Sequence, residues 1–438
     1  MGQSLRAWRL AVSRPAPSVR LFVGIDLGTS GIRLGAIDDK GRPYTVLSRH
    51  WKPDQAFNPG AWLGHTTDLI ALLQRKAPHA RIEALAVDGT SGTVLLCHPH
   101  TGRPLTSVLP YDDGRATQEA RDLAADGLTE GPAAGPYGGP AKILWLGRHG
   151  VDHARAQVVT QASWLTGALL GHWRYCDEHN ALKLGFENQW HDALIGRHWP
   201  VKWPDIRPAG APLGRLCHPL ARRLRLHQAP LIVAGTTDST AASLAQGPLS
   251  PGMGITSLGS SLVLKIVSPR PISVPECGVY SHRIGSLYLA GGASNSGGAV
   301  LAHYFSQAAL AQLSAELPIA PPTGLDYYPL LTVGERFPHY DPLMEPRLHP
   351  RPTDDRVFLQ GILEGLADIE AQGYAVLARH GAPRLILVTT TGGGARNNAW
   401  RLLRERALGV PVQNAAQRPA VLGSAYLARI GSQIAHQR

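Results

Sequence analysis

Four turns rich in glycine, serine and threonine interrupt the apolar runs of this sequence and limit what it can fold into. They read DLGTSG at residues 26–31, DGTSGT at 88–93, SLGSS at 257–261 and TGGGARNN at 391–398. Glycines let the backbone approach a ligand closely, and free N–H groups with hydroxyls donate to phosphate oxygens. One such turn is usually only a hairpin, but four in one chain indicate a phosphate site.

Hydrophobic periodicity predicts a similar succession of elements in both halves of the chain. In the first half, strands are expected at residues 21–25, 32–37, 44–47 and 82–87, and a helix at 61–75. In the second half, strands are expected at 231–234, 254–258, 262–267 and 385–388, and helices at 358–377 and 395–408. A unit of strand, small-residue turn and strand therefore recurs, and we expect the domain boundary within residues 235–250.

Length and composition agree with a folded α/β protein of more than one domain. The chain has 438 residues, of which 44% are hydrophobic, enough for large cores. Residues 1–20 contain four arginines and no acid, and we expect a disordered basic extension there. The four cysteines form no CxxC motif, which suits a reducing cytosol, so we expect a cytoplasmic protein.

The net charge of +11 raises the question of an acidic partner. The basic residues are scattered, apart from a small cluster at residues 221–227. No motif of a known nucleic-acid module is present, and no apolar run approaches the about 18 residues of a membrane span. We expect a generally basic surface with no nucleic-acid or membrane partner, and a homodimer stays open.

One carboxylate lies at the end of a predicted buried strand. The stretch AGTTDSTAA at residues 234–242 places Asp238 among small residues and hydroxyls, with no Lys or Arg nearby in sequence. A carboxylate without a cationic partner keeps its basicity, and small neighbours leave room for a substrate. Asp238 is therefore a candidate general base that accepts a hydroxyl proton. The alternative is an Asp that caps a helix starting near Ser239.

The sequence has no GxxxxGK[ST], and no GxGxxG follows its first predicted strand, which argues against a P-loop or a dinucleotide fold. The four turns instead resemble those of the FGGY sugar kinases, within the actin, hexokinase and Hsp70 superfamily. In this resemblance, residues 26–30 are similar to the first phosphate loop, 257–261 to the second and 391–397 to the adenosine loop. The resemblance extends from about residue 21 to about residue 428.

Longer strings narrow the resemblance to the D-ribulose kinase branch, whose members are xylulose kinase-like. They are VDGTSGTVLLC (87–97), HNALKLG (179–185), AGTTDST (234–240), GGASNSGGA (291–299), GLDYYPL (324–330) and GERFP (334–338). The resemblance implies an α/β fold of two RNase H-like domains flanking a central cleft, with residues 21–240 binding sugar and 241–438 binding nucleotide. It implies the reaction of D-ribulose with ATP to give D-ribulose 5-phosphate and ADP, with Mg²⁺. D-Xylulose, another pentulose or a pentitol stays open as the substrate.

The resemblance also implies roles for individual residues. Asp238 is expected to be the catalytic base and to contact the sugar. The other expected sugar-binding residues are Asp26, Ser30, Gly31, Ile32, Arg33 and Ser91, and Asp26 is also expected to hold Mg²⁺, directly or through water. The expected nucleotide-binding residues are Gly28, Thr29, Gly259, Ser260, Gly392, Gly393, Gly394, Ala395, Arg396 and Asn397.

Alternative interpretations accompany several of these residues. Asp26 could be a hairpin-turn residue, Arg33 a solvated strand residue, and Asp88 could tie its own turn together by an Asx bond. Lys183 and Asp326 lie in the matching strings but have no assigned role. A second class of function is an actin-like or chaperone-like ATP-binding protein that hydrolyses ATP without a sugar acceptor. The sugar-side strings at residues 88–93 and 234–240 argue against that class.

Overall fold

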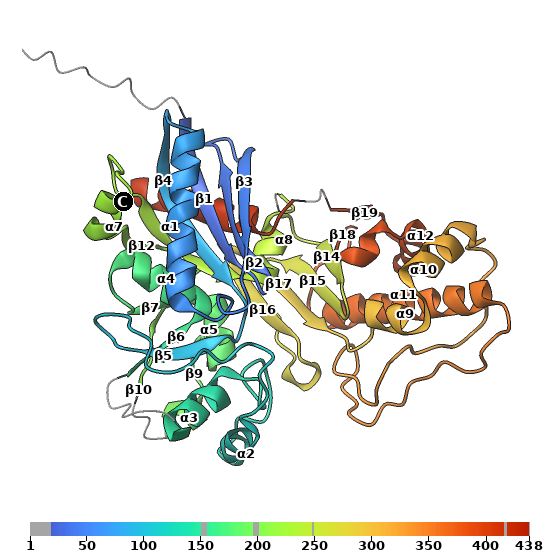
Figure 1. Cartoon of the computed structure of the whole chain (residues 1–438). Coiled ribbons are helices and arrows are strands. Elements are labelled where there is room, and N and C mark those ends of the chain that lie inside the picture. Colours follow the sequence, from blue (N-terminus) through green and yellow to red (C-terminus); the bar gives the residue numbers. More distant parts are fainter. Residues whose placement is uncertain (1–18, 150–155, 196–200, 248, 416–417, 438) are drawn as a thin grey trace, which may run out of the picture.

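The computed structural model describes residues 19–149, 156–195, 201–247, 249–415 and 418–437 (Figure 1). Most of the basic extension expected at residues 1–20 lies outside the described residues. Residues 19 and 20 already belong to the first strand, β1 (Val19–Leu27).

The first half of the chain is built on a mixed sheet of six strands in the order β12-β13-β4-β1-β2-β3. Besides β1, its strands are β2 (Gly31–Ile37), β3 (Pro43–His50), β4 (Ala80–Gly89), β12 (Pro212–Arg215) and β13 (Leu231–Thr237). The strands β1, β2 and β3 form an antiparallel meander, whereas β4 and β13 join β1 in parallel. The carboxyl ends of β1, β4 and β13 therefore lie together.

The second half repeats this arrangement in a sheet of six strands ordered β16-β17-β15-β14-β18-β19. Its strands are β14 (Met253–Leu258), β15 (Leu262–Ser268), β16 (Tyr280–Ile284), β17 (Leu287–Ala293), β18 (Leu387–Thr391) and β19 (Val412–Asn414). An antiparallel β17-β15-β14 meander is again followed by two parallel strands. The expected fold with two RNase H-like sheets is confirmed.

Helices and smaller sheets cover these two sheets. The helices are α1 (Pro59–Lys76), α2 (Thr117–Ala125), α3 (Gly139–His149), α4 (Gln161–Leu170), α5 (Glu178–Ala181), α6 (Asp192–Ile195), α7 (His218–Arg223), α8 (Asp238–Leu244), α9 (Gly298–Tyr304), α10 (Gln307–Glu316), α11 (Asp355–Arg379), α12 (Asn398–Leu408) and α13 (Val421–His436). The short strands are β5 (Val94–Cys97), β6 (Ala156–Thr160), β7 (Tyr175–Asp177), β8 (Phe186–Glu187), β9 (Gln189–Trp190), β10 (Val201–Lys202) and β11 (Asp205–Arg207). The predicted strands and long helices are confirmed, whereas the sequence analysis predicted no helix or strand within residues 94–230.

Three hydrophobic clusters arrange the two halves as layers. One joins α1 and α4 to one face of the first sheet, and another joins α11 to the second sheet (Figure 1). The third contains Phe22 and Val233 of the first sheet, Ile255 and Val267 of the second, and residues of α8 and α13. The helices α8 and α13 therefore pack in an apolar layer shared by both sheets.

The helix α13 departs from the expected division of the chain. Residues 241–438 were assigned to the C-terminal domain, but α13 packs on β1, β4, β13 and α8. Gly24 of β1 makes this approach possible, because an added Cβ would lie 2.1 Å from the carbonyl oxygen of Val421. The end of the chain thus returns to the first sheet.

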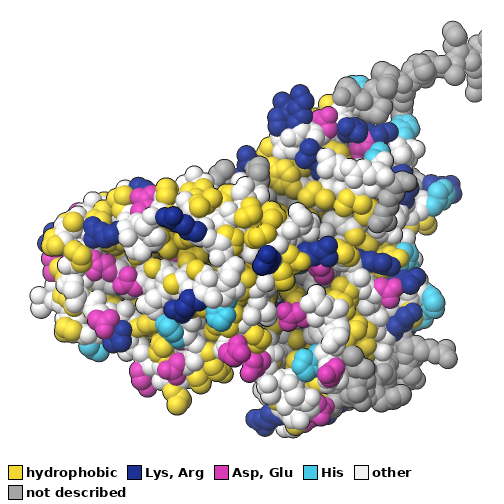
Figure 2. Space-filling view, turned by 180° about the vertical axis from the view of Figure 1, so that it is seen from behind, with side chains coloured by type: hydrophobic (Ala, Val, Ile, Leu, Met, Phe, Trp, Pro, Cys, Tyr) yellow, Lys and Arg dark blue, Asp and Glu magenta, His cyan; other side chains and the backbone are white. Residues whose placement is uncertain are grey.

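Charged side chains are spread over the surface. On the face in Figure 2, Lys and Arg side chains are interspersed with Asp and Glu and do not gather into one basic region. None of the described helices is both long and apolar enough to cross a membrane.

A buried ion pair holds the second half together. Arg404 of α12 donates to both carboxylate oxygens of Glu370 on α11, at 2.5 and 2.8 Å, and also to Thr390 Oγ1 at 2.7 Å. Thr256 of β14 donates to Glu370 at 2.6 Å. Arg404 and Glu370 are 1% and 0% exposed.

Replacing one partner of this pair should strongly destabilise the protein. We expect Arg404→Met to lower the free energy of unfolding by about 3–5 kcal/mol, because Glu370 is left buried and unpaired. The matched control on the same helix is Arg401→Met, which breaks a partly exposed pair with Glu405 and should cost below about 1 kcal/mol. Urea and thermal denaturation measure both values, and equal losses would contradict the assignment.

Candidate active site

Three carboxylates meet at the carboxyl ends of the parallel strands. Asp88 of β4 lies opposite Asp26 of β1 on one side and Thr236 of β13 on the other. Asp238 follows β13 directly as the first residue of α8. Asp26 and Asp88 are 3% and 0% exposed. Burial, followed by the charge of Asp26, raises the pKa of Asp88 well above its usual range.

The carboxylate of Asp238 is not used to cap a helix. Thr237 is the N-cap of α8, and its side-chain oxygen accepts a hydrogen bond from the Thr240 N–H at 3.3 Å. Asp238 Oδ1 accepts from the N–H of Ser239 at 2.6 Å. Burial raises the pKa of Asp238 to about 6, although the Ser239 N–H opposes this rise. Asp238 is therefore not the N-cap of α8, although one of its oxygens accepts a hydrogen bond from the first turn, and burial makes its carboxylate more basic than usual.

A cation that is remote in sequence also acts on Asp238. The charge of Lys265 on β15 lowers the pKa of Asp238, and the carboxylate in turn raises the pKa of Lys265. Burial dominates for the lysine and lowers its pKa to about 8. Asp238 is on α8 and Lys265 is on β15 of the second sheet, so the packing of α8 near that sheet brings their charges within range of each other.

Asp26 and Arg33 form an ion pair across neighbouring strands. They lie opposite each other in the β1/β2 register, and Arg33 Nη1 donates to Asp26 Oδ2 at 3.0 Å. The Arg33 side chain is 44% exposed, whereas that of Asp26 is 4% exposed. Asp26 is therefore a strand residue rather than a turn residue, and Arg33 keeps exposed N–H groups for a ligand.

The first loop is held in place by Trp51. Its indole N–H donates to the carbonyl oxygen of Gly28 at 2.8 Å, and its backbone N–H donates to that of Ser30 at 3.2 Å. Thr29 and Ser30 are exposed between these two anchors. The expected phosphate loop thus has a fixed backbone and free side chains.

Two other residues expected at the sugar have structural roles. A Cβ on Gly31 would lie 2.3 Å from the carbonyl oxygen of Arg49, so pairing with β3 requires glycine there. The side chain of Ile32 is fully buried in the core of the first sheet. A sugar contact by Ile32 would therefore come from its backbone.

Asp88 does not form the Asx bond considered for it. Its Oδ2 accepts a hydrogen bond from Ser424 Oγ, which ties α13 to the first sheet. Ser91 is half-buried in the turn that follows β4. Beside it, Gly92 has φ +89° and the side chain of Lys183 packs against it. Lys183 therefore lies at the edge of this turn.

The loops of the second sheet approach neighbouring backbone closely. The N–H of Gly298, at the start of α9, donates to the carbonyl oxygen of Gly259 at 2.9 Å. Gly392 follows β18 with φ +87°, and a Cβ there would lie 2.6 Å from the carbonyl oxygen of Leu258. Only glycine satisfies both conditions at residue 392.

A cavity of about 830 Å³ lies between these loops and the helices α9, α10 and α12. The expected nucleotide-binding residues that line it are Gly259, Ser260, Gly393, Gly394, Arg396 and Asn397. Gly392 and Ala395 belong to the same turn but do not line the cavity. Gly28 and Thr29 do not line it either, because their loop is on the first sheet. All lining residues come from the second half of the chain, within residues 258–400.

Asn397 has a structural role beside its expected one. It is the N-cap of α12, its Oδ1 accepts from the Trp400 N–H at 3.0 Å, and its Nδ2 donates to Ser314 Oγ at 2.9 Å. The helix expected at residues 395–408 therefore begins at residue 398, after a 3₁₀ turn at Gly393–Arg396. Ser314 on α10 was missed, because that helix contains no loop motif in its sequence.

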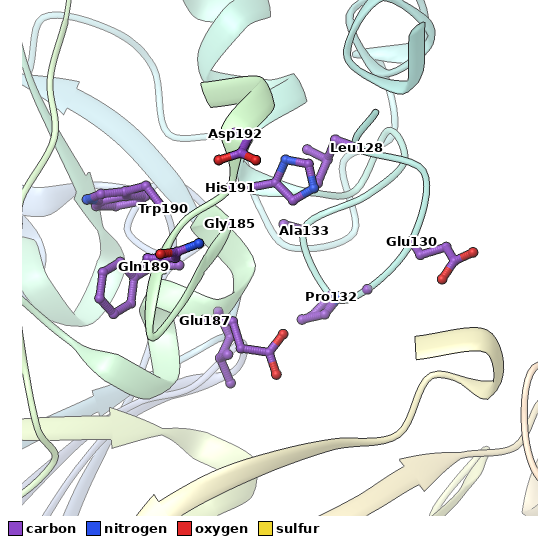
Figure 3. Close-up of a pocket in the computed structure, with 13 residues that line it drawn as sticks. Leu128, Glu130, Pro132, Ala133, Gly185, Glu187, Gln189, Trp190, His191 and Asp192 are labelled. Atoms are coloured by element: carbon purple, nitrogen blue, oxygen red, sulfur yellow. The ribbon is translucent and has the colours of Figure 1, made fainter. Parts of the chain in front are cut away.

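A second, smaller hollow of about 240 Å³ lies in the first half of the chain (Figure 3). Its lining includes Trp190, Phe186, Glu187, Glu130 and Asp192. None of the residues expected at the sugar or the nucleotide lines it. This hollow is therefore separate from the carboxylates at the strand ends.

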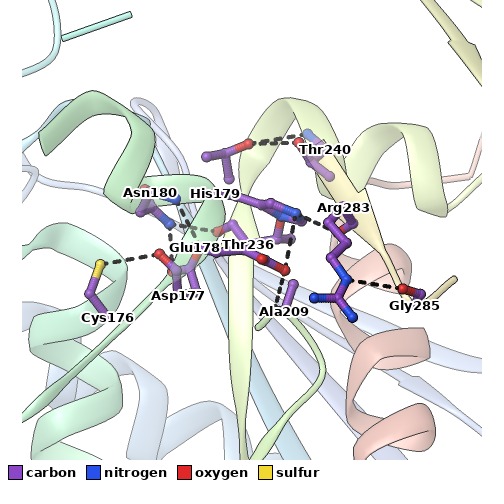
Figure 4. A network of polar contacts seen from close by, with 11 residues as sticks. Cys176, Asp177, Glu178, His179, Asn180, Ala209, Thr236, Thr240, Arg283 and Gly285 are labelled. Carbon is purple, nitrogen blue, oxygen red and sulfur yellow. Dashed lines mark hydrogen bonds and ion pairs between the residues drawn. The ribbon is translucent and has the colours of Figure 1, made fainter. Parts of the chain in front are cut away.

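His179 joins the two halves through hydrogen bonds to Thr236 and Arg283 (Figure 4). Its Nε2–H donates to the carbonyl oxygen of Arg283 on β16 at 2.7 Å. The neutral ring then accepts at Nδ1 from the hydroxyl of Thr236 on β13, also at 2.7 Å. Burial lowers the pKa of His179 to about 4, which agrees with a neutral ring. The sequence analysis did not single out this residue.

Comparisons with known proteins agree with this architecture. Residues 254–432 match the C-terminal domain of the FGGY family of carbohydrate kinases. A glycerol kinase of Ralstonia nicotianae is 26% identical over 94% of this chain and 89% of its own length. The xylulose kinase of Escherichia coli is 24% identical over 94% of this chain and 90% of its own length.

Solved structures share the fold of the chain. The crystal structure of xylulose kinase from Rhodospirillum rubrum has a TM-score of 0.78 at 23% identity, over 94% of this chain and 90% of that one. Plasmodium falciparum glycerol kinase with ADP has a TM-score of 0.79 at 16% identity, over 95% and 90%. The fold is thus that of the sugar kinases of the actin, hexokinase and Hsp70 superfamily. The chain therefore shares the fold of these kinases, and the expected resemblance to the FGGY family is confirmed for residues 254–432, which match its C-terminal domain.

Removing the hydrogen bonds of His179 should weaken the contact between the halves. We expect His179→Phe to lower the free energy of unfolding at pH 8 by about 1–3 kcal/mol, because the Arg283 carbonyl loses its donor. The wild type should lose this advantage below pH 6.5, since the unfolded state then binds more protons than the folded state. As the pH falls, the stability difference between the wild type and His179→Phe should shrink by at most about 1.4 kcal/mol per pH unit.

The control for this variant is His149→Phe. His149 is exposed on α3 and stacks on Trp145, and its loss should change stability by below about 0.5 kcal/mol. Denaturation at pH 8 and pH 5 measures both variants. A stability gap for His179→Phe that is independent of pH would contradict a neutral buried ring.

Proposed function

We propose that this protein is a carbohydrate kinase and transfers the γ-phosphoryl group of ATP to the C5 hydroxyl of D-ribulose, giving D-ribulose 5-phosphate and ADP. Residues 21–240 would bind the sugar and residues 241–438 the nucleotide. The observation that carries the proposal is the position of Asp238, a carboxylate with a pKa of about 6 at a strand end between the two sheets.

The proton transfer follows from the chemistry of this carboxylate. A sugar hydroxyl is a weak nucleophile, and Asp238 accepts its proton while the oxygen bonds to phosphorus. The bond from that phosphorus to the bridging oxygen of ADP breaks in the same step, and ADP leaves with the electron pair. The side chains of Arg33 and Ser91 would orient the sugar through its other hydroxyls. Packing of the halves around the site would exclude water, which competes as acceptor.

The cavity of the second half supports the nucleotide site. It is bounded by two glycine-containing loops at Gly259 and Gly393, and its volume of about 830 Å³ suits a nucleoside. Arg396 supplies a positive charge at its edge. Asn397 and Ser314, which are hydrogen-bonded to each other, would contact the base or the ribose.

The chain supplies few ligands for Mg²⁺. Among the described residues, no group of three or more His, Cys, Asp or Glu side chains could hold a metal ion. Mg²⁺ in kinases is often held by one or two carboxylates, phosphate oxygens and water, and Asp26 is a buried carboxylate at the strand ends. Asp26 would hold it directly or through water, and the metal would neutralise charge on the phosphates.

D-Ribulose is proposed on the strings at residues 87–97, 179–185, 234–240 and 291–299, which resemble the D-ribulose kinase branch. The relatives named xylulose kinase and glycerol kinase make D-xylulose the second candidate and glycerol a required comparison. Purified protein should release ADP faster with D-ribulose than with D-xylulose, ribitol, glycerol or a hexose, measured as kcat/KM. A preference for any other acceptor would overturn the D-ribulose assignment. ADP release that no acceptor stimulates would favour the ATP-hydrolysing scaffold.

Asp238→Asn should keep the shape of the site and remove its base. We expect kcat to fall by at least about 10²-fold with the KM for sugar nearly unchanged. The matched control is Asp326→Asn, which changes an exposed carboxylate paired with Arg347 and should keep wild-type turnover. Near-normal kcat in Asp238→Asn, measured by ADP release, would remove the general base from the proposal.

A further inference from the structure

Glu335 is a buried carboxylate that the proposed reaction does not use. It is 2% exposed and lies in the long connection between α10 and α11. A carboxylate buried to this degree is costly unless hydrogen-bond donors satisfy its oxygens. The groups that surround Glu335 therefore indicate what it does.

Donors from three segments of the second half converge on the two oxygens of Glu335. Its Oε2 accepts from the hydroxyls of Ser294 at 2.6 Å and of Tyr328 at 2.9 Å. Its Oε1 accepts from the backbone N–H groups of Asn295 at 2.7 Å and of Arg336 at 2.9 Å. Burial, followed by the charge of Glu335, raises the pKa of Tyr328 above its usual range, so this hydroxyl stays protonated and donates. Glu335 therefore fixes the segment that follows β17.

The segment fixed by Glu335, residues 294–299, supports the expected second phosphate loop. The N–H of Gly298 donates to the carbonyl oxygen of Gly259 at 2.9 Å, and the N–H of Ala299 donates to that of Ser260 at 3.1 Å. The two backbones are so close that a Cβ on Gly298 would lie 2.6 Å from the Gly259 carbonyl oxygen. A displacement of segment 294–299 would therefore displace the loop.

These contacts decide which way the peptide groups of the loop point. In a trans peptide unit, the carbonyl and the N–H point in opposite directions. The carbonyl oxygens of Gly259 and Ser260 face segment 294–299, so the N–H groups of Ser260 and Ser261 point away from it. Within the described part of the chain, neither N–H donates to another backbone group. Because Gly259 and Ser260 line the cavity of about 830 Å³, both N–H groups can donate to phosphate oxygens there.

We propose that Glu335 is a positioning residue for the triphosphate of ATP. It holds segment 294–299 against the phosphate loop and thereby keeps the N–H groups of Ser260 and Ser261 directed at the β- and γ-phosphates. Glu335 does not line the cavity, and its negative charge would repel phosphate in direct contact, so it acts through the backbone of the loop. This inference rests on the proposed nucleotide site and adds a residue outside it.

The test compares the binding of ADP and of AMP, each with Mg²⁺, to the variant Glu335→Leu by titration calorimetry. AMP lacks the β-phosphate and does not need the loop. We expect the Kd for ADP to rise by about tenfold or more, because hydrogen bonds to a charged group are lost, and the Kd for AMP to change by less than about twofold. In steady-state kinetics, the KM for ATP should rise while the KM for the sugar stays at the wild-type value.

Two control variants separate the positioning role from a general loss of structure. Glu335→Gln keeps an oxygen for the backbone N–H groups, and the two hydroxyls can turn to accept from its amide, so the affinity for ADP should stay near that of the wild type. Glu345→Leu makes the leucine substitution at an exposed carboxylate of the same connection and should keep both affinities.

Equal losses of ADP and AMP affinity in Glu335→Leu, or an unchanged affinity for ADP in the folded variant, would overturn the inference. If Glu335→Leu does not fold, Ser294→Ala removes one donor of the same contact and carries the test. A selective loss of ADP affinity in that variant supports the inference, and unchanged or equally reduced affinities overturn it.

The calorimetric test is independent of the sugar. A wrong assignment of D-ribulose would leave the role of Glu335 standing, because ADP and AMP bind without an acceptor. Unchanged ADP binding in Glu335→Leu would remove only that role and leave the proposed function standing. A wild type that does not bind ADP would overturn the proposed nucleotide site and this inference together.

Discussion

Parallel pairing of β1 with β4, and of β4 with β13, is the constraint on which the rest of the structure depends. Parallel strands end on the same side, so Asp26, Asp88 and Asp238 at the ends of three separate apolar runs lie near one another. The second sheet repeats the same strand order, and its turns surround the cavity proposed for the nucleotide. Carboxylates that lie close together repel one another when they are ionised. The groups that surround them must therefore compensate for this repulsion.

Those surroundings are supplied by the layer between the sheets. The helices α8 and α13 belong to one apolar cluster that includes residues of both sheets. The charge of Lys265 on β15 acts on Asp238, and His179 bonds to Thr236, two residues before Asp238. Ser424 of α13 donates to Asp88, so the last helix of the chain also stabilises the acids at the strand ends. The helices α8 and α13 therefore both pack between the two halves and carry residues of the candidate active site.

Local patterns predicted much of the fold and the loops. Apolar alternation and helical spacing identified β1, β2, β4, β14, β15, α1 and α11, because burial imposes these periods on the side chains. The glycine-rich turns were found because close backbone approach excludes other residues, as at Gly392. The direction of the Ile32 side chain was not predicted, because a residue that follows an expected phosphate loop can still point into the core. The segment 94–230 was missed because its strands are short and its helices carry no motif.

The sequence by itself determined the order of strands and turns, the two sheets and the identity of Asp26 and Asp238 as candidate acids. These follow from local spacing and from short strings of residues. Only the tertiary structure decided that Lys265 interacts with Asp238, that His179 bridges β13 and β16, and that α13 returns to the first sheet. The physical reason is that electrostatic interaction and burial depend on distance in space, and folding makes distant parts of the chain neighbours without leaving a local pattern.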